Sequence, residues 1–207
     1  MSIHTLTNLI ARWDADEGKP YKGSLIDDDF DGDEPPLSCM CAQGQVLHVV
    51  AGWNATALRR ADQDEADLEV ARLLNISRAH SVLLRNINDN ADGAPAIVLR
   101  LSDDGIGKVL GSEWSRLLDF WHYLDGMTAE QWAAARDAVR DAVRDAAGAA
   151  AWDAAGAAAW DAAGAAAEIQ GAHIFAAAER PFFFLPAFGF TTPADIPERP
   201  ANYGVEA

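Results

Sequence analysis

An alanine-rich repeat fills much of the second half of the chain and limits the folds open to it. From Arg136 the residues run in groups of four, in the order RDAV, RDAV, RDAA, GAAA, WDAA, GAAA, WDAA and GAAA. Alanine has the highest helix propensity of the amino acids, so the repeat predicts a long helix over residues 129–179. Each glycine within it costs about 1 kcal/mol relative to alanine, so we expect a kink or break near one of them.

A spacing of four residues does not keep side chains on one face of a helix. Four residues advance by about 400°, so such a row winds around the helix by about 40° at each step. On a straight helix the carboxylates of Asp137, Asp141 and Asp145 lie opposite Trp132. The later repeats are apolar nearly all round and need to be enclosed. Since glycine and alanine permit close approach of backbones, this helix is the expected contact if the protein forms oligomers.

The bulk of a core has to come from outside the repeat. The chain has 42 alanines, and without them its hydrophobic share falls from 50% to about 30%, while burial of apolar surface stabilises a fold by about 25 cal/mol per Å2. The seven Trp and eight Phe residues must therefore supply much of the buried area. Several of these Phe residues follow Pro181, so we expect residues 181–207 to pack back on the alanine-rich helix.

The first part of the chain is also expected to be helical. Apolar side chains at helical spacing predict helices near residues 3–13, 64–74, 78–87 and 113–124. Residues 96–101, AIVLRL, are the best candidate for a short strand, which would be at most a minor β element. The fold class is therefore mainly α. Three parts are expected to form one cooperative unit: a helical domain with an acidic loop at 14–36 (1–127), the alanine-rich helix (128–180) and the aromatic tail (181–207).

Local signals refine these helices. In the helix at 64–74 we expect Leu68 and Leu74 on the buried side. Asp125-Gly126 closes the helix at 113–124. Side chains that can accept a hydrogen bond from the first helical turn predict three helix starts, at Ser77, Ser112 and Thr128, the last with capping-box spacing to a Gln.

The charge of the chain excludes several classes of partner. Sixteen basic and 32 acidic residues give a net charge of −16, whereas a protein that coats nucleic acid or anionic lipid needs a basic surface. We therefore expect neither nucleic acid nor a membrane as a partner. Residues 1–13 lack the features of a secretory signal, and there are two cysteines, so a cytoplasmic protein without disulfides is expected.

The densest run of acidic residues lies in the predicted loop. Residues 14–36 carry nine carboxylates and two lysines, a composition that cannot bury enough apolar surface to fold alone. Within it, Asp27–Asp33 matches the first half of a calcium-binding loop, with Gly32 at the sixth position. The twelfth position, which needs a bidentate Glu, is Ser38. The sequence therefore favours a solvated acidic loop over a calcium site.

No motif points to catalysis or to a cofactor. Cys39-x-Cys41 has no second pair of ligands for zinc, and His48 is expected to be a core residue. His122 and Asp119 are three apart on an aromatic helix, a pair that is expected to be structural. We expect no metal, no cofactor and no catalytic residue, with an enzyme whose site is scattered in the sequence as the remaining alternative.

One segment suggests a DNA-binding motif. Residues 69–85, EVARLLNISRAHSVLLR, resemble the helix-turn-helix of excisionase-like and MerR-like domains. Asn75 replaces the usual turn glycine, which is acceptable because Asn tolerates a left-handed conformation. Ser81 departs from the pattern, since a hydrophobic residue is normal there. The resemblance implies a DNA-binding regulator as an alternative function, with three residues facing DNA: Arg78, His80 and Arg85.

The repeat itself carries a second resemblance. Its Trp-Asp-Ala-Ala units, over roughly residues 133–178, resemble tracts in phage and bacterial proteins, some of which are described as immunity proteins. The resemblance implies a small helical protein of a phage or other mobile element that binds and blocks a partner.

These observations together predict a non-enzymatic accessory protein of the inhibitor, immunity or anti-defence type. Its partner is expected to be a basic protein, such as one that handles nucleic acid, because complementary charge raises the rate and specificity of association. The expected contact residues are the acids of the loop and of the first repeats: Asp27, Asp28, Asp29, Asp31, Asp33, Glu34, Asp137, Asp141 and Asp145.

Overall fold

The computed structural model describes residues 3–90, 95–100, 106–107, 110–145, 182 and 185–204. These residues are mainly helical, which confirms the predicted fold class, and their β structure is limited to one isolated bridge. The chain divides into two compact units. Unit 1 contains Met1–Gly105 and Asn202–Ala207, and unit 2 contains Ile106–Ala201. The helix at 114–125 and the aromatic tail up to Ala201 thus belong to the same unit as the start of the alanine-rich helix.

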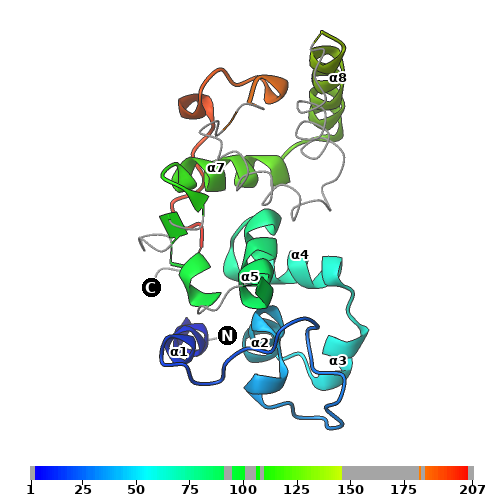
Figure 1. The fold of residues 1–207 in the computed structure, drawn as a ribbon, viewed down its shortest axis with the longest axis vertical. Helices are drawn as coiled ribbons and strands as arrows, with labels where there is room; N and C mark the ends of the chain where they lie inside the picture. Colours follow the sequence, from blue (N-terminus) through cyan, green and yellow to red (C-terminus); the bar gives the residue numbers. More distant parts are fainter. Residues whose placement is uncertain are drawn as a thin grey trace. The chain divides into compact units, whose positions relative to one another are not determined.

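Unit 1 is built from helices joined by short turns and by one long loop (Figure 1). The predicted helices near 3–13, 64–74 and 78–87 are confirmed to within a few residues, while a short helix at 55–60 was not expected. The predicted strand at 96–101 is wrong, because this segment begins with a 3-10 helix, Pro95–Val98. The α-helices of unit 1 are α1 (Ile3–Asp14), α2 (Ala42–Ala51), α3 (Ala55–Arg60), α4 (Gln63–Leu74) and α5 (Arg78–Asn90).

Helix α5 forms the centre of unit 1 and contacts α2, α4 and the 3-10 helix Pro95–Val98. Residues 79–84 are buried without exception, so the first half of α5 is enclosed on all sides. Helix α4 turns Asp67, Val70 and Leu74 toward the core. Leu68, which we expected on that side, is 54% exposed, because it follows the buried Asp67 by about 100° around the helix.

Two of the three predicted helix starts are confirmed. The hydroxyl of Ser77 accepts the backbone N–H of His80 at 3.0 Å. Thr128 and Gln131 form the expected capping box: the Thr128 hydroxyl accepts the Gln131 N–H at 3.2 Å, and the Gln131 side chain accepts the Thr128 N–H at 2.8 Å. The start at Ser112 is wrong, because the helix begins two residues later and no side chain caps it.

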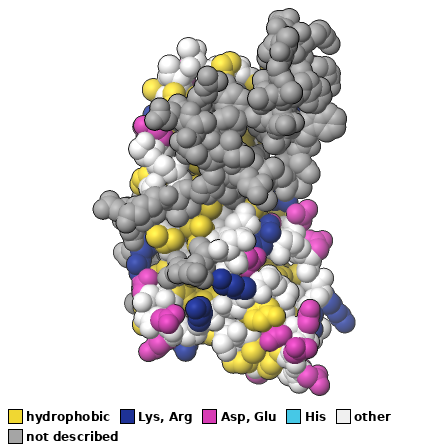
Figure 2. Space-filling view, viewed as in Figure 1, with side chains coloured by type: hydrophobic (Ala, Val, Ile, Leu, Met, Phe, Trp, Pro, Cys, Tyr) yellow, Lys and Arg dark blue, Asp and Glu magenta, His cyan; other side chains and the backbone are white. Residues whose placement is uncertain are grey.

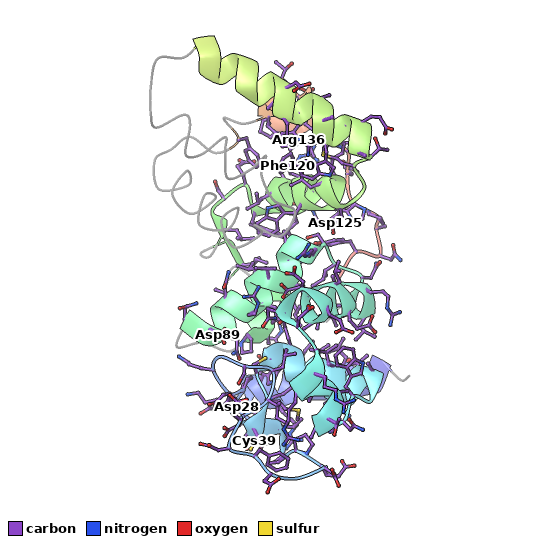
Figure 3. All side chains as sticks on the ribbon, turned by 90° about the vertical axis from the view of Figure 1, so that its right-hand side faces the viewer. Asp28, Cys39, Asp89, Phe120, Asp125 and Arg136 are labelled. Atoms are coloured by element: carbon purple, nitrogen blue, oxygen red, sulfur yellow. The ribbon has the colours of Figure 1, made fainter. Side chains whose placement is uncertain are left out.

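Unit 2 joins the first turns of the alanine-rich helix to the aromatic tail. Its described α-helices include α7 (Trp114–Asp125) and α8 (Ala129–Asp145). Figure 3 labels Phe120 on α7 and Arg136 on α8. Phe188, in the 3-10 helix Leu185–Phe188, meets the rings of Phe120 and Trp132 edge-on, with centroids 5.1 and 6.2 Å apart. The part of the tail around Phe188 therefore packs on the beginning of the alanine-rich helix, as expected, whereas Asn202–Ala207 belong to unit 1.

The predicted continuation of this helix to residue 179 lies outside the described residues. The side chains of Asp141 and Asp145 do so as well. No helix in the described part of the chain is long and apolar enough to cross a membrane.

Candidate acidic interface

The long loop between α1 and α2 is fixed at its base by backbone hydrogen bonds. Ile26 and Met40 form an antiparallel bridge, and the Asp27 N–H donates to the Cys39 carbonyl at 2.7 Å. This base packs directly on α2, since a Cβ added to Gly44 would lie only 2.0 Å from the Leu25 carbonyl oxygen. The entry and the exit of the acidic segment are therefore held together against the core.

Buried amide side chains hold the rest of the loop. The amide nitrogen of Gln45, on α2, donates to the carbonyls of Leu37 at 2.8 Å and Gly18 at 3.0 Å, and its oxygen accepts the Trp13 indole N–H at 2.7 Å. Asn88, on α5, donates to the Tyr21 carbonyl at 2.8 Å. Because unpaired buried amides are costly, these bonds fix the path of the loop.

The tip of the loop, Asp27–Glu34, carries six carboxylates and no Lys or Arg. We call this segment the acidic tip. Asp27 is half-buried and organises the tip, because its side chain accepts the Asp29 N–H at 3.1 Å and its carbonyl accepts the Phe30 N–H at 3.1 Å. Arg59 of α3 donates to the Phe30 carbonyl and lies over the Phe30 ring, 5.9 Å from its centroid. The other five carboxylates are exposed, and Figure 3 labels Asp28 on this loop.

Within the described part of the chain, the guanidinium of Arg59 lies at the acidic tip, where it binds the Phe30 carbonyl and no carboxylate. Among the described residues, no Lys or Arg forms an ion pair with a carboxylate of the tip; instead, arginines pair with acids elsewhere. In Figure 2, Asp and Glu side chains, drawn in magenta, gather on the lower right of the surface. The pairs that use these arginines are Arg72–Glu69, Arg78–Asp64, Arg85–Asp67, Arg100–Asp14, Arg116–Asp119 and Arg199–Asp119.

The second group of predicted contact residues is described only in part. Asp137 is exposed on α8 and belongs to unit 2. The acidic tip belongs to unit 1. That both groups contact the partner stays a prediction.

The cysteines take part in the base of the loop. The Cys41 sulfur caps α2 by accepting the Gly44 N–H at 3.4 Å, and burial raises the pKa of its thiol to about 11. A thiol with such a pKa is a poor nucleophile near neutral pH, since the thiolate is the reactive form. Cys39 is half-buried, and both are free thiols.

In the ranges that the structure describes, no three His, Cys, Asp or Glu side chains are placed to hold a metal ion. His48 is half-buried, not fully buried, and its Nδ1 lies 2.7 Å from the Trp53 carbonyl. Asp119 is buried and bonds to Arg116 and Arg199.

The residues of the DNA-binding alternative lie in and around the core of unit 1. The turn between α4 and α5 has the expected form, with Asn75 in the left-handed conformation at φ 52°. His80 is fully buried and bonds to the Val98 carbonyl, so it is a core residue and not a surface one. Arg78 and Arg85 are paired with carboxylates, at 2.8 and 2.9 Å.

Sequence analysis missed a buried polar cluster at the centre of unit 1. The Asp67 carboxylate accepts bonds from Gln43 at 2.7 Å and from Arg85 at 2.9 Å, and Gln43 also bonds to the Ser81 hydroxyl at 3.0 Å. One signal could have found it. Gln43 and Gln45 flank a glycine in an otherwise apolar helix, and polar side chains in such a place need buried partners.

Comparison with protein-family models, with curated proteins and with solved structures gave no match.

Proposed function

We propose that the protein is a non-enzymatic binding protein whose acidic tip docks on a basic partner protein and blocks it, as an inhibitor or immunity protein does. A basic protein that handles nucleic acid fits this chemistry, because its Lys and Arg residues are spaced to meet phosphate charges. The observation that supports the proposal is the combination of six carboxylates, none of which forms an ion pair with a described Lys or Arg, and a loop base that is fixed to the core.

The fixed base matters for affinity. A flexible acidic loop loses conformational entropy when it binds, whereas a loop held by Gln45, Asn88 and the Ile26–Met40 bridge has lost most of it already. The exposed carboxylates then act mainly on the rate of association, which electrostatic steering raises and which salt reduces. We therefore expect fast, salt-sensitive association with the partner.

Two matched variants test the proposal. The tip variant carries Asn at Asp28, Asp29, Asp31 and Asp33. The control variant carries Gln at four exposed glutamates outside the tip: Glu17, Glu65, Glu113 and Glu198. Both change the net charge from −16 to −12, since each removes four negative charges.

Immobilised wild type and both variants are used to capture proteins from a host lysate at low salt, and association rates are then measured with the captured protein after purification. We expect the tip variant to associate at least tenfold more slowly and the control variant to behave as wild type. Equal rates for the two variants would show that only the total charge matters and would refute the acidic tip as the contact.

The DNA-binding regulator is the second candidate, because the left-handed Asn75 and the Ser77 cap give the turn a helix-turn-helix form. Its test is retardation of a specific duplex that is lost on Arg78→Ala. Enclosure of the first half of α5 and pairing of its arginines make this candidate the weaker one.

A further inference from the structure

The C-terminal residues 202–204 lie against the turn between α4 and α5, although unit 2 separates them in sequence from the rest of unit 1. Asn75 binds the segment at two points. Its side-chain nitrogen donates to the Asn202 carbonyl at 2.6 Å, and its own carbonyl accepts the Gly204 N–H at 2.8 Å. Asn75, in its left-handed conformation, thus presents a side-chain N–H donor and a backbone carbonyl acceptor to the backbone of residues 202–204. The edge of a sheet binds an added strand by the same alternation of donor and acceptor.

Between these two points, Tyr203 enters a polar pocket. Its hydroxyl accepts the Ser77 N–H at 3.0 Å and lies 3.2 Å from the Ser77 hydroxyl and 3.1 Å from Nδ1 of His80. The rings of Tyr203 and His80 stack with centroids 5.9 Å apart. Because the Val98 carbonyl can only accept, Nε2 of His80 donates to it, while Nδ1 lies within hydrogen-bond distance of the phenol. The pocket therefore selects a tyrosine over a phenylalanine.

Among the described residues of the segment, Tyr203 provides most of the attachment to unit 1. Ala201 and Asn202 are exposed, and only Tyr203 is buried. The preceding residues 191–200 include three prolines and are mostly exposed. Release of Tyr203 leaves the contacts among α2, α4 and α5 in place, and an opening that breaks so few contacts needs less free energy than global unfolding.

We propose that the pocket formed by Asn75, Ser77 and His80 is a docking site for residues 202–204 of this chain, which act as a releasable strap. With the strap docked, the chain of unit 2 is tied to unit 1 at both of its ends. With the strap released, the polypeptide of unit 2 is tied at one end only. Release of the strap thus frees one of the two chain connections between unit 1 and unit 2.

Peptide binding to a full-length chain with an empty pocket tests the proposal. The chain carries Tyr203→Ala, and the probe is a fluorescent peptide of residues 200–207, PANYGVEA, followed by anisotropy. The matched control peptide has Phe in place of Tyr203, which keeps the ring and removes the hydroxyl. We expect the Phe peptide to bind about tenfold more weakly, and wild type, whose own strap fills the pocket, to bind the Tyr peptide more weakly than the variant does.

Three results would overturn the proposal: no binding of the Tyr peptide to a folded Tyr203→Ala chain, equal binding of both peptides, or loss of the helical circular dichroism in the variant. The last result would mean that Tyr203 is an inseparable part of the core.

Hydrogen exchange on the wild-type chain gives an independent readout. The Ser77 amide is bonded to the Tyr203 hydroxyl, and the Gly204 amide is bonded to Asn75, so release of the strap frees both. We expect these two amides to exchange together and faster than the amides in the middle of α5. If both exchange as slowly as the middle of α5, the strap opens only on global unfolding and the proposal fails.

Discussion

Replacement of Arg85 by alanine tests whether this residue stabilises the fold or is available to contact DNA. Asp67 has a side chain that is 2% exposed, and the Arg85 guanidinium supplies its neutralising charge through bonds of 2.9 and 3.3 Å. Breaking a buried ion pair by removal of one partner costs about 3–5 kcal/mol, because the remaining charge stays buried. Since the Arg85 side chain is partly exposed and water can replace it, we expect a loss of about 3 kcal/mol, the lower end of this range.

The control is Arg72→Ala, which breaks an ion pair within α4, the helix that carries Asp67. Arg72 is 68% exposed and bonds to Glu69 three residues away, and exposed pairs contribute about 0–1 kcal/mol. Unfolding in urea is followed by circular dichroism. With a slope of about 1–3 kcal/mol per M, Arg85→Ala should lower the midpoint by roughly 1–3 M and Arg72→Ala by a few tenths. A second change, Asp67→Asn, should restore part of the stability of Arg85→Ala, because it removes the buried charge.

Equal midpoints for Arg85→Ala and Arg72→Ala would refute this reasoning. They would show that the charge of Asp67 is not enclosed, and Arg85 would then be available for another role, including the contact with DNA that the sequence resemblance implies. A large loss of stability that Asp67→Asn does not relieve would indicate that the aliphatic part of Arg85, and not its charge, stabilises the core.

Four further outcomes are expected. Cys39 should react with iodoacetamide before Cys41, because with a pKa of about 11 only about one Cys41 thiol in a thousand is ionised at pH 8; equal rates would contradict the burial of Cys41. Since that thiol keeps its proton in the folded state and loses it near pH 8.5 when unfolded, the free energy of unfolding should fall as the pH rises from about 8.5 to 11. Gly44→Ala should detach the base of the acidic loop, seen as faster proteolysis of the loop than in wild type. Phe188→Ala should lower the free energy of unfolding of unit 2 by about 3–5 kcal/mol in urea titration, since Phe188 is buried between two other rings.

The sequence predicted the helices well where local rules decide them. Helix α4 ends at an Asn in the left-handed conformation and α8 begins with a capping box, both of which depend on neighbouring residues alone. The segment at 96–101 was misread as a strand because its β-branched residues fit a buried 3-10 helix equally well. Leu68 was misplaced because the buried side of α4 is set by Asp67, whose partners come from α2 and α5.

The candidate site, too, could be predicted from the sequence only where local features decide it. Composition alone predicts the exposed acidic tip, and exposure of its carboxylates agrees with that. No local pattern predicts that the loop base is fixed by Gln45 and Asn88, since these contacts join residues far apart in the sequence. His80 bonds to the Val98 carbonyl and to Tyr203, which is more than one hundred residues away. The motif contains neither partner, so it implied a surface role for His80.

The fixed base of the acidic loop separates stability from recognition. Every bond that holds the base comes from backbone atoms or from side chains outside Asp28–Glu34, whereas those seven residues add little to the core. The like charges of the carboxylates repel one another, and the hydrogen bonds at the base keep the loop closed in spite of this repulsion. The charge, the size and the order of the side chains in this segment can therefore change while the helices stay unaffected. Such a loop can acquire a new binding partner through substitutions that do not alter the fold.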